Sequence, residues 1–577
     1  MRILFCAQHF TYFRNYESVV RLLAARGHRV HLAAEESEEL GGQALVERLA
    51  AECAGVTWGS APDLAEERWF NLAAKIRHGL EYVRFLDPAY DERPKYRHRA
   101  EVWSPRMLRA FFRLRGARIA PLRALVGKAL VQCDRLLPSS EALDAFLLEQ
   151  APDVLLLASV TNPGSPQMDY LKAARRLRIP VAMCVFSWDH LSGKSWIRIA
   201  PDRVLVWNET QRDEAISQHG LPAERVEVTG AQCWDQWFER QPSRSYETFC
   251  RELGLDPSRP FVLYACSVLS RPAPNEAQFV LEWIRQVRSS SDPRLHGIGI
   301  LVRPHPERMG EWDGVDLREH ANVAFRGRNP VDPAAKDDYF DSLHHSAAMV
   351  GIVTSAFIEA AIVGRDVLTI ALPELSLHQR GAPHFNYLVE VAGGLLTVAR
   401  SFDEHLAQLA GAVEMAAAGR SARNTRFLEA FVRPRGLDSP ATPAFVESVE
   451  RLAAAGPAAA PAAATLAWRC QQALVRRLAA AGSSGGVVEW MLMDERDAES
   501  AIVERGKAEL KREAVAAREA REREQQRTRE HALSEKEGAR RRKARRKAGR
   551  ERQQRLVQFG RRLAGLVGVG SRQNIQP

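Results

Sequence analysis

The segment Arg2-Ile3-Leu4-Phe5-Cys6 is an apolar run of strand length at the start of the chain. Tyr16–Arg26 follows with apolar residues at helical spacing, and Gly27 is a residue type that commonly ends a helix. A second apolar run, Arg29–Ala33, comes directly afterwards. This order predicts a strand, a helix and a second strand, joined by the right-handed crossover of a parallel sheet.

The same alternation returns in two further series, one from about residue 153, after a helix-rich stretch at 66–150, and one from Pro260. The strands expected in these series are Asp153–Leu157, Pro180–Phe186, Asp202–Trp207, Arg225–Val228, Phe261–Cys266, Gly297–Val302, Asn322–Phe325, Met349–Val353 and Asp366–Ala371. The pattern predicts an α/β fold with two doubly wound, Rossmann-like domains facing a cleft. The N-terminal domain is expected at 1–240 and the C-terminal domain at 246–450.

Cysteine usage and charge narrow the class of protein. The eight cysteines are scattered and form no C-x-x-C motif, which argues against a zinc site and a secreted disulfide framework. We find no signal peptide and no uninterrupted apolar run of about 20 residues, so a cytoplasmic protein is expected. The net charge is +10, and residues 540–562 contribute +11 of it, so the remainder is nearly neutral. The basic character is therefore expected in the tail alone.

The C-terminal part has a different composition from the body. Residues 452–467 are rich in Ala and Pro and predict a linker, and 468–577 predict a helical, highly charged basic tail. The helix expected at 493–555 has too few apolar positions for a convincing heptad coiled coil. Residues 540–567 mix arginines with apolar residues. Such a segment can hold the protein peripherally on an anionic membrane surface, which we expect to be the inner membrane face. Nonspecific contact with acidic polymers is the alternative, and nucleic acid is not expected because interleaved aromatics are missing.

Two motifs follow strands of the second series. Arg303-Pro304-His305-Pro306-Glu307 comes after the strand expected at Gly297–Val302, where a guanidinium and an imidazole can bind a nucleotide diphosphate. Thr354 and Ser355 follow another strand and precede a helix, whose start can bind an anion. Glu359 lies one turn further on, where a carboxylate can accept hydrogen bonds from a ribose. An ordinary proline turn and a plain capped helix are the structural alternatives.

The pair of motifs, Arg-x-His-Pro and Thr-Ser-x-x-x-Glu-Ala, resembles the donor domain of GT-B glycosyltransferases. Within them it is most similar to the capsule-polysaccharide and CDP-glycerol glycerophosphotransferase-like branch. The resemblance implies that the C-terminal domain binds a nucleotide-activated donor and the N-terminal domain binds the acceptor. It implies phosphate contacts for Arg303, His305, Thr354 and Ser355, and a ribose contact for Glu359. Gly351 stands where many retaining members have the first glutamate of a Glu-x7-Glu pair, and no Asp-x-Asp motif is present.

A third motif follows the strand Pro180–Phe186. Gly193-Lys194-Ser195 is not the end of a P-loop, because Trp188 occupies the position of the first glycine. We expect Asp189 to deprotonate an acceptor hydroxyl, Trp188 to stack on a sugar ring, and His190 to face the cleft. A Trp-anchored turn capped by the aspartate is the alternative.

Three further residues complete the candidate set. His9 and Arg14 follow the first strand, where His9 is a second candidate base and Arg14 can touch acceptor or donor phosphate. A satisfied structural histidine is the alternative for His9. His378 follows the last expected strand and is a candidate contact for the donor sugar.

These observations predict a metal-independent transferase without a cofactor. It would move a sugar or polyol phosphate from a nucleotide-sugar or CDP-polyol donor to a cell-envelope glycan or lipid-linked acceptor. One alternative is a nucleotide-sugar 2-epimerase or a sugar-modifying hydrolase with the same fold. The other is a non-catalytic GT-B scaffold that its basic tail recruits to a membrane or polyanion.

Overall fold

The structure is a computed structural model. It describes residues 1–456, 469–475, 477 and 547–560, apart from short gaps at 37–40, 65–66, 68, 92, 138–139, 159–160, 162–165, 270–273, 328, 376–377, 380 and 417–418. Residues 1–494 form one compact unit and 495–577 a second. The expected fold and all the candidate site residues fall in the first unit.

The N-terminal half contains a seven-stranded sheet with the order β3-β2-β1-β4-β5-β6-β7. Its strands are β1 (Arg2–His9), β2 (Arg29–Glu36), β3 (Val56–Ser60), β4 (Val154–Ala158), β5 (Val181–Cys184), β6 (Arg203–Val206) and β7 (Val226–Val228). Each neighbouring pair is parallel. The order of the strands reverses between β1 and β4, and ligands of doubly wound sheets bind at such a switch point.

The C-terminal half repeats this plan in a six-stranded parallel sheet with the order β10-β9-β8-β11-β12-β13. Its strands are β8 (Phe261–Ala265), β9 (Gly299–Arg303), β10 (Val323–Phe325), β11 (Ala348–Val350), β12 (Asp366–Ile370) and β13 (Thr397–Ala399). Here the switch point lies between β8 and β11. The predicted pair of doubly wound sheets is confirmed.

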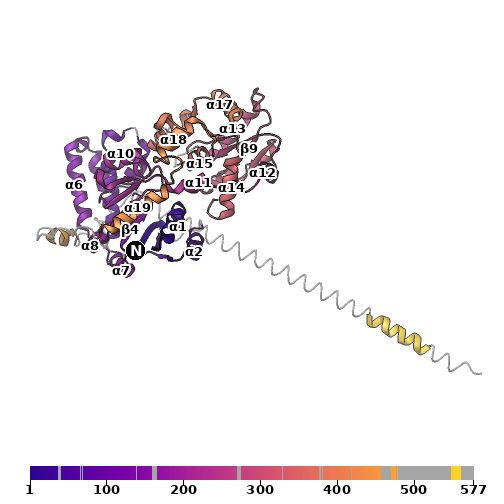
Figure 1. Cartoon of the computed structure of the whole chain (residues 1–577), viewed down its shortest axis with the longest axis horizontal. Helices are drawn as coiled ribbons and strands as arrows, with labels where there is room; N and C mark the ends of the chain where they lie inside the picture. The colour runs from indigo at the N-terminus through magenta and orange to yellow at the C-terminus, as the bar shows by residue number, and fades with distance from the viewer. Residues whose placement is uncertain are drawn as a thin grey trace, which may run out of the picture. The chain divides into compact units, whose positions relative to one another are not determined.

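Helices cover both sheets and form an insertion in the N-terminal half (Figure 1). In the N-terminal half they are α1 (Glu17–Ala25), α2 (Gly42–Glu52), α3 (Phe70–Phe85), α4 (Pro94–Trp103), α5 (Arg106–Arg113), α6 (Ala120–Leu136), α7 (Glu141–Gln150), α8 (Gln167–Leu177), α9 (His190–Gly193), α10 (Glu209–Ser217) and α11 (Asp235–Glu239). Those that follow are α12 (Tyr246–Leu253), α13 (Glu276–Ser289), α14 (Pro333–His345), α15 (Ala356–Ile362), α16 (Pro383–Glu390), α17 (Phe402–Met415), α18 (Ala422–Phe431) and α19 (Ala441–Ala454). The insertion α3–α6 corresponds to the helix-rich stretch expected from the sequence.

The last helix of the body, α19, returns to the N-terminal half and lies beside α1 and β4 (Figure 1). Phe445, Val446 and Val449 join the apolar core on one face of the first sheet. The returning chain is tied down by Asp235, whose carboxylate accepts hydrogen bonds from the backbone N–H groups of Ala441 (3.0 Å) and Thr442 (2.7 Å). The segment 246–450 therefore supplies the second sheet and also a part of the first half's core.

The two halves also share an apolar core. Trp207, Trp234 and Trp237 of the N-terminal half belong to one buried cluster with Phe340 and Phe357 of the C-terminal half. Burial of aromatic side chains on this scale stabilises both halves together, because each large aromatic removes on the order of 150–250 Å² from water.

The expected linker and tail are described only in part. α19 extends to Ala454, and residues 457–467 of the expected linker lie outside the described residues. Helical residues 469–475 follow, and Val475 packs with Ala73 and Leu136. In the second unit, residues 547–560 are helical and exposed. Among the described residues, no helix has the length and apolarity needed to cross a membrane.

Candidate functional site

Loops at the carboxyl ends of both sheets line one cavity of about 480 Å³. A volume of this order suits a nucleotide-sized ligand. Eight of the predicted site residues line it: His9, Arg14, Trp188, Arg303, His305, Thr354, Ser355 and Glu359. Strands distant in sequence end at the same sheet edge, so the doubly wound topology brings these residues together.

Arg303 ends β9 and is almost completely buried. Its guanidinium donates to the Asp338 carboxylate (2.9 Å) and to Ser342 Oγ (2.7 Å), both from α14. It also lies over the ring of Tyr339, with its Cζ atom 5.2 Å from the ring centroid. These contacts fix the guanidinium at the cavity wall, and its charge is already partly balanced by the Asp338 carboxylate.

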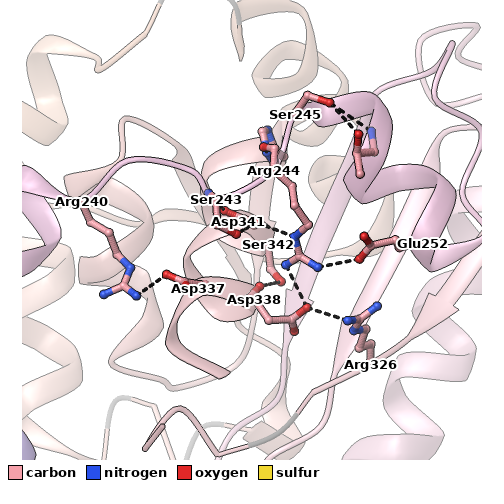
Figure 2. A network of polar contacts seen from close by, with 12 residues as sticks. Arg240, Ser243, Arg244, Ser245, Glu252, Arg326, Asp337, Asp338, Asp341 and Ser342 are labelled. Atoms are coloured by element: carbon pink, nitrogen blue, oxygen red, sulfur yellow. Dashed lines mark hydrogen bonds and ion pairs between the residues drawn. The ribbon is translucent and has the colours of Figure 1, made fainter. Parts of the chain in front are cut away.

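Asp338 belongs to a larger polar network that includes the segment joining the halves (Figure 2). Its carboxylate also lies 3.2 Å from Arg244 and 3.1 Å from Arg326. Arg244 in turn contacts Asp341 (2.8 Å), which accepts a hydrogen bond from the backbone N–H of Ser243 (2.8 Å). The chain between α11 and α12 is therefore attached to the helix that positions Arg303.

His305 begins the turn after β9 and is half-buried in the cavity wall. Its Nδ1 accepts a hydrogen bond from the backbone N–H of Glu307 (3.2 Å), which leaves Nε2 to carry the proton of the neutral ring. Burial lowers the pKa of His305, opposed by Glu307 and reinforced by Arg14 and Arg308. A neutral imidazole that donates from Nε2 can hydrogen-bond to a phosphate oxygen.

Thr354, Ser355 and Glu359 line the cavity from the start of α15. Thr354 Oγ1 accepts from the backbone N–H of Ala356 (3.3 Å), whereas Ser355 is exposed and its side chain does not cap the helix. The Tyr339 hydroxyl donates to the Glu359 carboxylate. Burial raises the pKa of Glu359, partly offset by Tyr339, Trp234 and Arg14. Tyr339 thus holds the Glu359 carboxylate in place beside the cavity.

The cations of the lining differ in how their charge is balanced. Three of them form ion pairs: Arg303 with Asp338, Arg240 with Asp337, and Lys336 with Glu17. Arg14, on the 3-10 helix η1 (Phe10–Tyr16), instead donates to the neutral side-chain amide of Asn329 in the other half (3.4 Å). No ion pair of Arg14 with a carboxylate is found among the described residues. Arg14 is therefore the lining cation best placed to bind an anionic group.

On the N-terminal side, His9 and Trp188 line the cavity, but two of their predicted companions do not. His9 packs edge-on against Tyr12, with ring centroids 5.4 Å apart. The Asp189 carboxylate accepts from Ser187 Oγ (2.5 Å) and lies 3.9 Å from the Lys194 ammonium, outside the lining. His9 is thus the candidate base within the cavity.

Asp189 forms a polar group with Ser187 and Lys194 next to Trp188 in the sequence. Burial alone would raise the pKa of Asp189, but Lys194, His384, His190 and Ser187 together lower it well below its usual range. Such a carboxylate is a poor proton acceptor at neutral pH. His190 is 2% exposed and packs edge-on against Phe186, so it does not face the cavity. Local packing after β5 turns both side chains away from the cavity.

His378, the predicted donor-sugar contact, also lies outside the lining. It is 4% exposed, and its backbone N–H donates to the carbonyl of Leu375 (3.0 Å). The turn after β12 therefore buries this imidazole.

The cavity also contains residues that the motifs did not predict. Trp234 and Trp237 follow β7 and line one wall, and Tyr339 lines another from α14. The two tryptophans come after a strand end, so the same reasoning that selected His9 would have found them. Tyr339 lies in the middle of a helix, where no local pattern marks it.

Comparisons with known proteins give fold similarity but no sequence relatives. No protein-family model matches the chain, and no significant match was found among curated proteins. The UDP-GlcNAc 2-epimerase of Neisseria meningitidis bound to UDP-GlcNAc is similar in structure, with 12% identity and a TM-score of 0.45 over 78% of this chain and 100% of that one. A glycosyltransferase of Rickettsia africae has 9% identity and a TM-score of 0.45 over 78% and 98% of the two chains. Arabidopsis thaliana UGT89C1 complexed with UDP has 11% identity and a TM-score of 0.43 over 78% and 100%.

The class of fold follows from the molecule's own topology. Two parallel doubly wound sheets present their switch points to one shared cavity, and the helix α19 crosses back to the first sheet. The chain has a GT-B glycosyltransferase-like fold. Since sequence identities of 9–12% identify neither activity nor substrate, the function must be argued from the site.

Proposed function

We propose that this chain is a transferase that moves a glycosyl group from a nucleotide-activated donor to an acceptor hydroxyl. The observation that carries the proposal is the convergence of Arg303, His305 and Glu359 with Arg14 of the other half on one cavity. Cations and a neutral histidine suit a diphosphate, and a carboxylate held by a tyrosine suits a ribose diol.

In the proposed reaction, the acceptor oxygen attacks the anomeric carbon while the bond from that carbon to the diphosphate oxygen breaks. Arg14, Arg303 and the Nε2–H of His305 stabilise the charge that develops on the departing nucleoside diphosphate. His9 takes the proton of the acceptor hydroxyl, because it is the candidate base that lines the cavity. Closure of the halves around both substrates would exclude water.

The acceptor is proposed to be a cell-envelope glycan or lipid-linked sugar, which matches a peripheral position at an inner membrane face. A CDP-polyol donor would use the same phosphate contacts, with transfer of a polyol phosphate in place of a sugar. The acceptor-dependent release of nucleotide distinguishes both from a 2-epimerase, which converts the sugar without an acceptor.

Arg14→Ala tests the donor site directly. Loss of one charge-assisted phosphate contact is expected to weaken binding of a nucleoside diphosphate about tenfold, measured as the ligand-dependent shift of the melting temperature for UDP, GDP and CDP. Arg212→Ala is the matched control, because Arg212 is 37% exposed on α10 and outside the cavity. The proposal fails if none of the nucleotides stabilises the wild-type chain.

His9→Ala tests the assignment of the base. It is expected to lower kcat by about 10²-fold or more while the nucleotide-dependent thermal shift stays at the wild-type value. Equal activity of His9→Ala and wild type would remove His9 from the mechanism.

A further inference from the structure

Large apolar side chains are exposed in an unusual concentration on the helical insertion of the N-terminal half. Five of them fall within 19 residues, and these are Met107 (49% exposed), Phe111 (37%), Leu114 (64%), Ile119 (56%) and Leu125 (63%). Met107 and Phe111 lie on α5, Leu125 lies on α6, and Leu114 and Ile119 flank the 3-10 helix η3 (Arg115–Arg118), which contacts both helices. The described residues of the body contain no second group of this density.

The geometry of α5 shows that this exposure is organised. Leu108 and Phe112 point inward and pack with the core of the insertion. Met107 and Phe111 are spaced i and i+4, so they form a second apolar stripe on the outward side, and the exposed Leu114 directly follows the helix. The outer stripe of a surface helix is normally polar, so an apolar one indicates a partner.

The segment that carries this stripe has charges of a single sign in its sequence. Residues 102–133 contain seven Arg or Lys and no Asp or Glu. Among these basic residues, Arg113, Arg118 and Lys128 are exposed, whereas Arg123 pairs with Asp87 (2.9 Å). The body as a whole is nearly neutral, but this segment gives it a locally basic surface.

We propose that residues 106–128 form a docking surface for an anionic lipid bilayer, independent of the basic tail. Exposed Phe and Leu side chains beside arginines can enter the interfacial region while the cations meet lipid phosphates. A second copy of this chain fits the surface poorly, because a symmetric contact would bring like charges together without an acid to balance them. In Figure 1 the helix α6 lies at the outer edge of the N-terminal half, away from the C-terminal half.

Docking at this surface would affect where the proposed acceptor-binding half lies. The insertion belongs to the half that carries His9, so docking would attach the proposed acceptor-binding half to the membrane surface. The docking surface and the cavity share no residues, so either proposal can fail while the other stands.

The test uses the full chain and vesicles of phosphatidylcholine with about one-third phosphatidylglycerol. Phe111→Ser with Leu114→Ser is expected to weaken vesicle binding at least about tenfold, measured by co-sedimentation, because the apolar contribution to insertion is lost. Leu148→Ser with Met415→Ser is the matched control, since these residues are 63% and 60% exposed on α7 and α17. Both variants keep the tail, and a melting temperature unchanged from wild type without ligand shows that the body has stayed folded.

Hydrogen exchange locates the contact. Vesicles are expected to slow amide exchange within 106–125, and pure phosphatidylcholine vesicles are expected to do so much less. Protection confined to 547–560, equal binding of the two double variants, or equal binding to neutral vesicles would overturn the proposal. Protection of 106–125 without vesicles, together with a dimer in ultracentrifugation that Phe111→Ser dissociates, would assign the surface to a second copy.

Discussion

Asp338 connects more of the candidate site than its position in the sequence suggests. Its carboxylate is 13% exposed and meets the guanidinium groups of Arg303, Arg244 and Arg326. These arginines, led by the hydrogen bond from Arg303, lower its pKa against the opposing effect of burial. Asp338 thus pairs with the cavity-lining Arg303 through Oδ2 and with Arg244 of the interdomain segment through Oδ1.

Asp338→Ala is therefore expected to destabilise the fold by about 2–4 kcal/mol, because buried Arg303 would lose its counter-charge. Asp337→Ala is the control, since Asp337 is 42% exposed and pairs with Arg240, an arrangement that contributes about 1 kcal/mol or less. Thermal unfolding of the two variants measures the difference. Equal melting temperatures would show that solvent or another acid replaces the Asp338 carboxylate.

The candidate site could be predicted where it follows strand ends and not elsewhere. Arg303 ends β9, and His305 and Thr354 lie in the loops after β9 and β11 of the same parallel sheet, so topology places them at one edge. Tyr339 reaches the same cavity from inside α14, and only the packing of that helix shows it. Asp189 also follows a strand, but the turn after β5 directs its carboxylate toward Lys194 and away from the cavity.

Among the elements, the central strands were predictable, whereas only two of the four edge strands, β7 and β10, were. β1, β4, β8 and β12 are buried apolar runs, which sequence patterns reveal clearly. β3 and β13 were missed, because they are edge strands of five and three residues with partly exposed side chains. Their strand conformation depends on pairing with β2 and β12, a long-range contact that no local pattern contains.

The contact between α19 and the N-terminal half gives a prediction for that element. Gly230 has φ +93, and a Cβ added there would lie 2.7 Å from the Cβ of Ala441 at the start of α19. Gly220 also has positive φ (+66), but an added Cβ would meet nothing within 4 Å. Both Gly→Ala variants incur backbone strain, and Gly230→Ala is expected to cost a further 1–3 kcal/mol or so by displacing α19. Chemical denaturation compares them, and equal stabilities would contradict a close α19 contact.

At the scale of the whole molecule, one contact between the two halves contains an ionisable carboxyl group. Glu214 of α10 is buried and accepts a hydrogen bond from the Tyr387 hydroxyl of α16. Burial raises the pKa of Glu214 to about 7, opposed by Tyr387 and Arg93. Between about pH 4.5 and 7 the folded chain keeps a proton that the unfolded chain releases, so this group lowers the free energy of unfolding as pH rises through that window.

Glu214→Gln removes the ionisable group but keeps an acceptor for Tyr387. The variant is expected to be more stable than wild type at pH 8, by about 2–3 kcal/mol at most, and equal to it near pH 4. Melting temperatures from pH 4 to 8 measure the effect. Glu209→Gln, at a 69% exposed position on the same helix, is expected to show no such pH-dependent gain, and a parallel change in both variants would contradict the assignment to Glu214.

The return of α19 to the first sheet has a consequence for evolution and engineering of this chain. Recombination that exchanges the C-terminal half with a single crossover near 240–245 would import a foreign α19 into the core formed by Phe445, Val446 and Val449. A chimera that keeps its own residues 1–240 and 441–454 and replaces only the part between them preserves that packing. The second sheet with its helices is thus exchangeable as an internal segment with two junctions, and the interval between Phe431 and Ala441 is the place for the second junction.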